Sequence, residues 1–135
     1  MRQVGILAAA GLVALSDGRD GTIDRLAEDH ANARRLAEAL SEMDGVVSAG
    51  GTAQPAPGPL DPGRVRTNFV LFKVERDRAA FLAALRARGV MMVEYPHGQV
   101  RAVTHYGVTA ADIDMTIRAS QDALLETRSA VAATA

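Results

Sequence analysis

Few residues in this chain are of types that carry out chemistry. The sequence contains three histidines and no cysteine. Without cysteine there is no thiolate nucleophile, no cysteine-ligated zinc and no disulfide. His30, His97 and His105 are not spaced three or four residues apart, so they form no local metal motif. The sequence therefore predicts no metal site and no catalytic nucleophile.

Two cationic side chains deserve closer comparison. Lys73 is the single lysine and so the single candidate for a Schiff base. Along an expected strand it shares one face with Phe69 and Leu71, while Phe72 and Val74 lie on the other face. We interpret it as a lysine at a strand edge or on the surface. Arg101 lies in another expected strand, and a guanidinium on a rigid strand can bind a carboxylate through two parallel N–H···O bonds. A solvated strand arginine is the alternative interpretation.

Two other patterns favour structural roles. His30 falls on the apolar stripe of an expected helix, which favours packing, and His97 falls in a turn, which favours exposure to solvent. Residues 17–24, with the sequence DGRDGTID, resemble a calcium-binding loop. The bidentate glutamate of such a loop is missing, so we interpret this stretch as a polar turn before a helix.

The elements that must position these residues follow from hydrophobic periodicity. Thr22 and Asp77 are predicted to cap helices, Gly45 and Gly89 to end them, and Thr109 with Asp112 to form a capping box. Helices are expected over 4–15, 22–43, 78–88 and 109–126, and strands over 46–49, 67–74, 90–94 and 99–104. Residues 96–98 read as a hairpin turn, and the proline-rich stretch 50–63 as a surface loop. This order predicts an α+β domain with helices on one face of a largely antiparallel sheet.

Residues 4–15 allow two interpretations. They are all apolar or glycine and follow Arg2, as in a signal peptide, although no A-x-A cleavage site comes after them. A buried, alanine-rich helix fits the pattern equally well. The run is too short to cross a bilayer, which takes about 20 residues.

Composition narrows the classes of partner. The chain has 135 residues, which suits one domain, and a net charge of -1. Neither nucleic acid nor an anionic membrane is expected as a partner, because such surfaces attract strongly basic proteins. The absence of cysteine suits a reducing compartment, so we expect a cytoplasmic location.

Five segments occur here in an order that resembles one enzyme family. They are MRQVGILAAAGLVAL, RLAEDHANARRLAEAL, RVRTNFVLFKV, LRARGV and VRAVTHYGVTAADID. Together they resemble the C-terminal portion of the L-threonine aldolases, which are β-eliminating lyases that depend on pyridoxal phosphate. The resemblance covers nearly all of residues 1–128, and it treats residues 1–15 as an internal helix of the family rather than a leader.

The resemblance implies a fold-type-I enzyme that cleaves L-threonine or L-allo-threonine to glycine and acetaldehyde. Its large domain holds the cofactor through a lysine, upstream of the segment that Met1 to Gln3 match, and Lys73 does not match that lysine. Arg101 matches the arginine that pairs with the substrate carboxylate. Arg2 matches an arginine near the cofactor phosphate, although the adjoining glycines are missing. Thr104 and His105 would support Arg101.

This resemblance also implies how the chain is organised. Residues 1–43 would form the linking helices, 44–128 the small α+β domain and 129–135 a frayed tail. An isolated chain of this kind is expected to be inactive, and its partners to be further copies of itself or a separate large-domain chain. Two alternatives are a non-catalytic remnant that binds a partner or self-associates, and one half of a split enzyme.

Overall fold

The computed structural model describes residues 4–16, 21–50, 58–75 and 77–132, with side chains as far as Arg128. Among these residues, four helices and a four-stranded sheet confirm the predicted α+β class. The helices are α1 (Val4–Ser16), α2 (Thr22–Ser41), α3 (Arg78–Ala87) and α4 (Ala110–Ala132). The strands are β1 (Val46–Ser48), β2 (Phe69–Val74), β3 (Val93–Tyr95) and β4 (Gln99–Val103), and two short 3-10 turns are η1 (Pro62–Arg64) and η2 (Pro96–Gly98).

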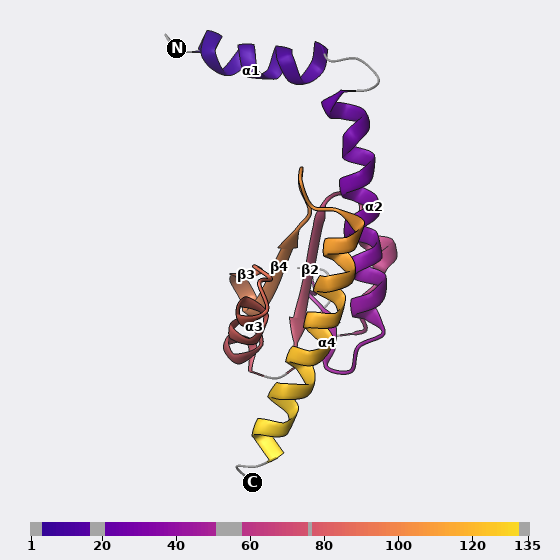
Figure 1. The fold of residues 1–135 in the computed structure, drawn as a ribbon, viewed down its shortest axis with the longest axis vertical. Helices are drawn as coiled ribbons and strands as arrows, with labels where there is room; N and C mark the ends of the chain where they lie inside the picture. Colours follow the sequence, from indigo (N-terminus) through magenta and orange to yellow (C-terminus); the bar gives the residue numbers. More distant parts are fainter. Residues whose placement is uncertain (1–3, 17–20, 51–57, 76, 133–135) are drawn as a thin grey trace.

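The sheet has the strand order β1-β2-β4-β3, and every neighbouring pair is antiparallel (Figure 1). β4 is therefore a central strand, with β2 on one side and β3 on the other. Arg101 is opposite Leu71 of β2 and Val93 of β3. This register places Arg101 at the middle of the sheet rather than at an edge.

One face of the sheet carries the core. Val70, Phe72 and Val74 alternate with less buried residues along β2, and Val100 and Ala102 do the same along β4. These side chains share one cluster with buried residues of α2, α3 and α4. Within it the rings of Phe72 and Phe81 meet edge to face, with centroids 6.3 Å apart. The three helices thus pack on one face, as predicted, and leave Arg101 on the other.

The observed helix ends agree in part with the ends predicted from the sequence. Asp77 caps α3, because its carboxylate accepts hydrogen bonds from the backbone N–H groups of Ala79 and Ala80. The prediction that Thr22 caps α2 is wrong, since Gly21 takes that position and makes no side-chain cap bond. Gly45 does not end α2, which stops at Ser41. It lies instead in the turn before β1, with a positive φ of 87° that favours glycine.

The turn between β3 and β4 is the predicted hairpin. The residues between the paired Tyr95 and Gln99 are Pro96, His97 and Gly98, and the last two have positive φ, at 63° and 78°. Glycine and asparagine are the residues that adopt this left-handed conformation most readily. His97 is exposed, as expected.

Some segments pack differently from the prediction. β3 begins at Val93, because Val90 and Met92 turn into the core before the strand starts. The stretch 50–63 is not wholly a surface loop, since Leu60 is buried in the core, while residues 51–57 lie outside the described part. α4 extends to Ala132, beyond the expected end near residue 126.

The prediction that residues 4–15 form a buried helix is half right. They are helical, but none of the residues in α1 is buried. Figure 1 shows α1 projecting from the body beside the start of α2, so it has no sheet or helix layer to pack under. The first turns of α2 are also exposed, and so is His30, which corrects its predicted packing role. A helical periodicity shows which face is apolar but not what covers it.

Candidate functional site

Arg101 is half-buried on the sheet face that the helices leave open. Its guanidinium carbon lies 5.4 Å from the ring centroid of Tyr95 and 5.8 Å from that of Phe69. Its Nε is the one buried side-chain nitrogen or oxygen, among the described residues, that has no hydrogen-bond partner. The cation therefore has aromatic neighbours but no carboxylate bound to it from the described part of this chain.

Strand geometry explains how these three residues meet. Phe69 is opposite Val103 on β4, and Tyr95 is opposite Gln99. Each ring is thus diagonal to Arg101, one toward each end of β4, and diagonal neighbours are within reach of aromatic and long side chains. The sequence shows that Phe69 shares a face with Leu71 and Lys73. It does not show the register that brings Phe69 and Tyr95 to Arg101.

This arrangement suits the binding of an anion. No carboxylate of the described residues pairs with this half-buried guanidinium, so its terminal nitrogens can bind an anion that comes from outside these residues. A guanidinium also matches the planar, two-oxygen geometry of a carboxylate better than a lysine does. Beside it, Phe69 and Leu71 line a cavity of about 190 Å³ together with residues around β1 and η1. Its half-buried side chain and its two aromatic neighbours distinguish Arg101 from a fully solvated surface arginine, and the binding of a carboxylate stays a prediction.

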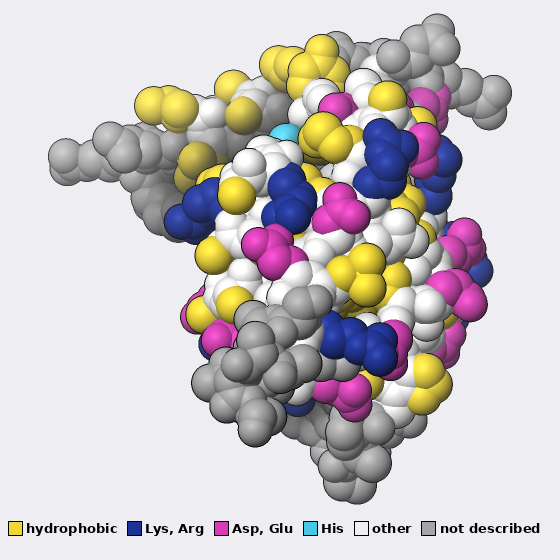
Figure 2. All heavy atoms as spheres, turned by 60° about the horizontal axis from the view of Figure 1, so that its bottom comes forward, with side chains coloured by type: hydrophobic (Ala, Val, Ile, Leu, Met, Phe, Trp, Pro, Cys, Tyr) yellow, Lys and Arg dark blue, Asp and Glu magenta, His cyan; other side chains and the backbone are white. Residues whose placement is uncertain are grey.

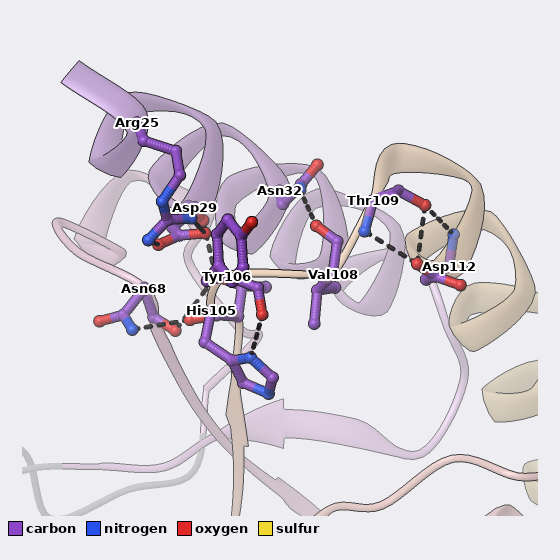
Figure 3. A network of polar contacts seen from close by, with 10 residues as sticks. Arg25, Asp29, Asn32, Asn68, His105, Tyr106, Val108, Thr109 and Asp112 are labelled. Atoms are coloured by element: carbon purple, nitrogen blue, oxygen red, sulfur yellow. Dashed lines mark hydrogen bonds and ion pairs between the residues drawn. The ribbon is translucent and has the colours of Figure 1, made fainter. Parts of the chain in front are cut away.

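A polar network fixes the end of β4 beyond Arg101 (Figure 3). The Thr104 hydroxyl donates to the backbone oxygen of Asp29 on α2, at 2.6 Å. Thr104 also exchanges hydrogen bonds with Asn68, which precedes β2: its N–H donates to the Asn68 carbonyl, and the Asn68 amide donates to its carbonyl. These bonds hold β2, β4 and α2 together, and the support of Arg101 by Thr104 stays a prediction.

Asp29 is a buried charge that the sequence analysis missed. Its carboxylate accepts two hydrogen bonds from the Arg25 guanidinium, at 3.1 and 3.2 Å. Tyr106 covers Arg25, with its ring centroid 4.8 Å from the guanidinium carbon (Figure 3). A buried carboxylate needs such a partner. The spacing of four residues between Arg25 and Asp29 on one helix was the available signal.

The segment after β4 leads into a capped helix. The His105 ring nitrogen Nδ1 contacts the Tyr106 carbonyl oxygen, and the Asn32 amide donates to the Val108 carbonyl. Thr109 and Asp112 form the predicted capping box, in which the Thr109 hydroxyl and N–H both donate to the Asp112 carboxylate. These two bonds, the hydroxyl first, lower the pKa of Asp112 below its ordinary value.

The other candidate residues have these positions. Arg2, the predicted cofactor residue, lies outside the described residues. Lys73 lies on β2, on the same face as Leu71, and pairs with Val47 of β1. Within the described ranges, no group of three histidine, aspartate or glutamate side chains could hold a metal ion.

Two properties of the surface concern possible partners. Basic and acidic side chains are interspersed on the face seen in Figure 2, in keeping with the net charge of -1. Among the described residues, no helix combines the length and apolar character that crossing a bilayer requires.

Comparison with known proteins identifies relatives. The sequence pattern of the β-eliminating lyase family matches residues 1–55, which include α1. The low-specificity L-threonine aldolase of Escherichia coli K12 is 39% identical over 110 residues, covering 81% of this chain and 27% of that protein. Low-specificity L-threonine aldolase 1 of Arabidopsis thaliana is 29% identical over 129 residues, covering 93% of this chain and 32% of that protein. The chain thus spans about a third or less of the length of these relatives.

Proposed function

Because this chain belongs to the threonine aldolase family of β-eliminating lyases, we propose that it is the C-terminal domain of a threonine aldolase-like lyase. The complete enzyme would cleave L-threonine or L-allo-threonine to glycine and acetaldehyde in the cytoplasm. This domain would bind the carboxylate of the amino acid. A large domain, in the same chain or a separate one, would supply the remainder of the active site, and the assembled enzyme would be a homo-oligomer.

The proposal rests on the state of Arg101. It combines a central position on β4, an open sheet face and a half-buried guanidinium with which no carboxylate of the described residues pairs. A carboxylate held there by two N–H···O bonds has a fixed plane, and the rest of the amino acid is then oriented for the breaking of one particular bond. The role of this chain is therefore to bind and orient the substrate.

The described residues do not form a pyridoxal phosphate site by themselves. Lys73 is the single lysine of the chain and does not match the family lysine, which the resemblance places upstream of the segment that Met1 to Gln3 match. Arg2 remains a proposed contact to the cofactor, which the large domain would hold for the most part. No reaction step through the cofactor is therefore assigned to residues of this chain.

A chimaeric enzyme tests this function. The segment of the Escherichia coli aldolase that aligns with this chain is replaced by this chain, and the same enzyme without that segment is the control. We expect the chimaera to bind pyridoxal phosphate and to form glycine and acetaldehyde from L-threonine, and the truncated control to form neither. A chimaera that is folded and loaded with cofactor, yet inactive, would contradict the proposal.

Self-association is a second candidate function, favoured by the exposed apolar surface of α1. Six large apolar side chains of α1 are 52–74% exposed: Val4, Ile6, Leu7, Leu12, Val13 and Leu15. Apolar patches of this kind commonly mark interaction sites. A second copy of the chain could cover them without any large domain.

Sedimentation of the isolated chain over a range of concentrations tests this candidate. Ile6 and Val13 are seven residues apart, on one face of the helix. If α1 drives association, the mass of the particles rises with concentration, and Ile6→Glu combined with Val13→Glu abolishes the rise. Met91→Glu is the matched control, because Met91 is 73% exposed on the body of the domain. A wild-type chain that stays monomeric would exclude this function.

A further inference from the structure

We propose that Phe69 and Tyr95 are positioning residues, which hold the Arg101 guanidinium so that its two terminal nitrogens bind the carboxylate end-on. This inference rests on the proposed function and adds which edge of the guanidinium is used. Guanidinium groups offer carboxylates two different edges, one formed by both terminal nitrogens and one that includes Nε. The surroundings of Arg101 distinguish these edges.

The first step concerns Nε. It is buried and has no acceptor, so an incoming carboxylate cannot reach it while the side chain keeps this conformation. Neither terminal nitrogen is among the buried unpaired atoms of the described residues. Because Arg101 as a whole is half-buried, the end of its side chain is the part that reaches solvent. The accessible edge is therefore the terminal one.

The second step concerns the rings. Both centroids lie within about 6 Å of the guanidinium carbon, the range in which an aromatic ring attracts a cation. The two rings come from different strands, β2 and β3, on opposite sides of β4. A guanidinium held from both sides has lost most of its rotamer freedom before the ligand arrives, so less conformational entropy remains to be lost on binding.

The third step concerns the exposure of the two aromatic rings. Phe69 and Tyr95 are 45% and 40% exposed, so neither is needed to fill the core. In the part of the molecule that the structure describes, no hydrogen bond of the Tyr95 hydroxyl is seen, and its ring faces Arg101. Two half-exposed aromatic residues beside an uncovered cation are better explained by its orientation than by packing of the domain.

The experiment uses the full chain labelled with ¹⁵N-arginine, with the Arg101 signals assigned from an Arg101→Lys variant. In the wild-type chain, the Arg101 Nε–H signal is expected to be shifted upfield by the rings and to exchange slowly with water. Glycine is then added, with glycinamide as the control probe that lacks a carboxylate. We expect glycine to shift the terminal nitrogens of Arg101 more than Nε, and glycinamide to shift neither.

Variants separate orientation from mere structure. Phe69→Leu and Tyr95→Leu are expected to speed Nε–H exchange and to weaken glycine binding about two- to five-fold each. Tyr95→Phe keeps the ring and is expected to behave as the wild type. Tyr106→Leu is the matched control, because it removes an exposed tyrosine that covers Arg25 instead. It should leave the Arg101 signals unchanged.

The outcomes distinguish this inference from the proposed function. If glycine fails to shift Arg101 in the wild-type chain, this inference is overturned, whereas the proposed function is decided separately by the activity of the chimaera. If glycine binds equally well to the wild type, Phe69→Leu and Tyr95→Leu, or shifts Nε most strongly, the inference alone is overturned. The Nε–H exchange rate of the wild type decides the matter even where a variant does not fold, since rapid exchange contradicts a buried Nε.

Discussion

Asp112 gives the clearest prediction at the scale of single residues. Hydrogen bonds from the Thr109 hydroxyl and N–H lower the pKa of its carboxyl group in the folded chain. A group of this kind stabilises the fold at pH values above its unfolded pKa, and this contribution is lost as the pH falls through the lower, folded pKa. Asp112→Asn should therefore lower the melting temperature at neutral pH.

The same substitution should matter less in acid. As the pH falls from the ordinary pKa of an aspartate, about 3.9, through the lower pKa of folded Asp112, the wild-type carboxyl group becomes protonated, and the two melting temperatures should converge. Thermal unfolding followed by circular dichroism at several pH values measures this convergence. A difference that stays constant from neutral to acid pH would show that the capping box does not carry the effect.

Arg101 shows what the sequence reveals at this scale. Its residue type and its strand were sufficient to predict a carboxylate site as one of two interpretations. Its neighbours Phe69 and Tyr95 could not be predicted, because they come from strands separated in the chain and only the register brings them together. Asp29 was missed because a charged residue inside a helical pattern is usually solvated, whereas here Asp29 is buried and pairs with the partly exposed Arg25.

At the scale of elements, two substitutions in the turn at His97 and Gly98 are expected to change the stability of the chain in opposite directions. Both residues have positive φ, which costs an ordinary L-residue about 1–2 kcal/mol. Asparagine tolerates this conformation better than histidine, so His97→Asn should stabilise the chain by a few tenths of a kcal/mol, up to about 1 kcal/mol. Gly98→Ala should destabilise it by about 1–2 kcal/mol, although no atom lies near enough to clash with the added methyl group.

Urea denaturation of both variants measures these changes. Equal effects of the two substitutions, or a destabilised His97→Asn, would contradict the left-handed backbone conformation of His97 and Gly98. The prediction concerns the hairpin of β3 and β4, and hence the strand that holds Tyr95 beside Arg101.

Elements were predicted better than their ends and surroundings. Periodicity identified α2, α3 and α4, each of which has a polar and an apolar side, and runs of residues that favour strands identified the four strands. It could not place α1, whose residues are apolar on all sides, so that its burial depends wholly on what lies next to it. Thr22 was wrongly expected to cap α2 because glycine at position 21 adopts the cap conformation equally well.

At the scale of the whole molecule, stability depends on the single core beneath the sheet. Phe81 is fully buried and contacts Phe72 edge to face. Phe81→Ala should reduce the free energy of unfolding by about 3–5 kcal/mol, a large part of the stability of a small domain. Met91→Ala, at a side chain that is 73% exposed, should change it by less than about 0.5 kcal/mol.

Chemical denaturation of the two alanine variants checks this difference. Similar losses in both would mean that the packing of α3 against the sheet is not what stabilises the domain. Since β4 belongs to the same core through Val100 and Ala102, the rigid position of Arg101 depends on that packing as well.

The most direct test of the proposed function is the kinetics of Arg101→Ala in the chimaeric aldolase. Loss of a charged pair with the substrate carboxylate should lower kcat/KM for L-threonine by about 2–4 kcal/mol, or roughly 30- to 1000-fold, with a raised KM and with cofactor still bound. An Arg101→Ala chimaera that cleaves L-threonine as efficiently as its parent would contradict the account.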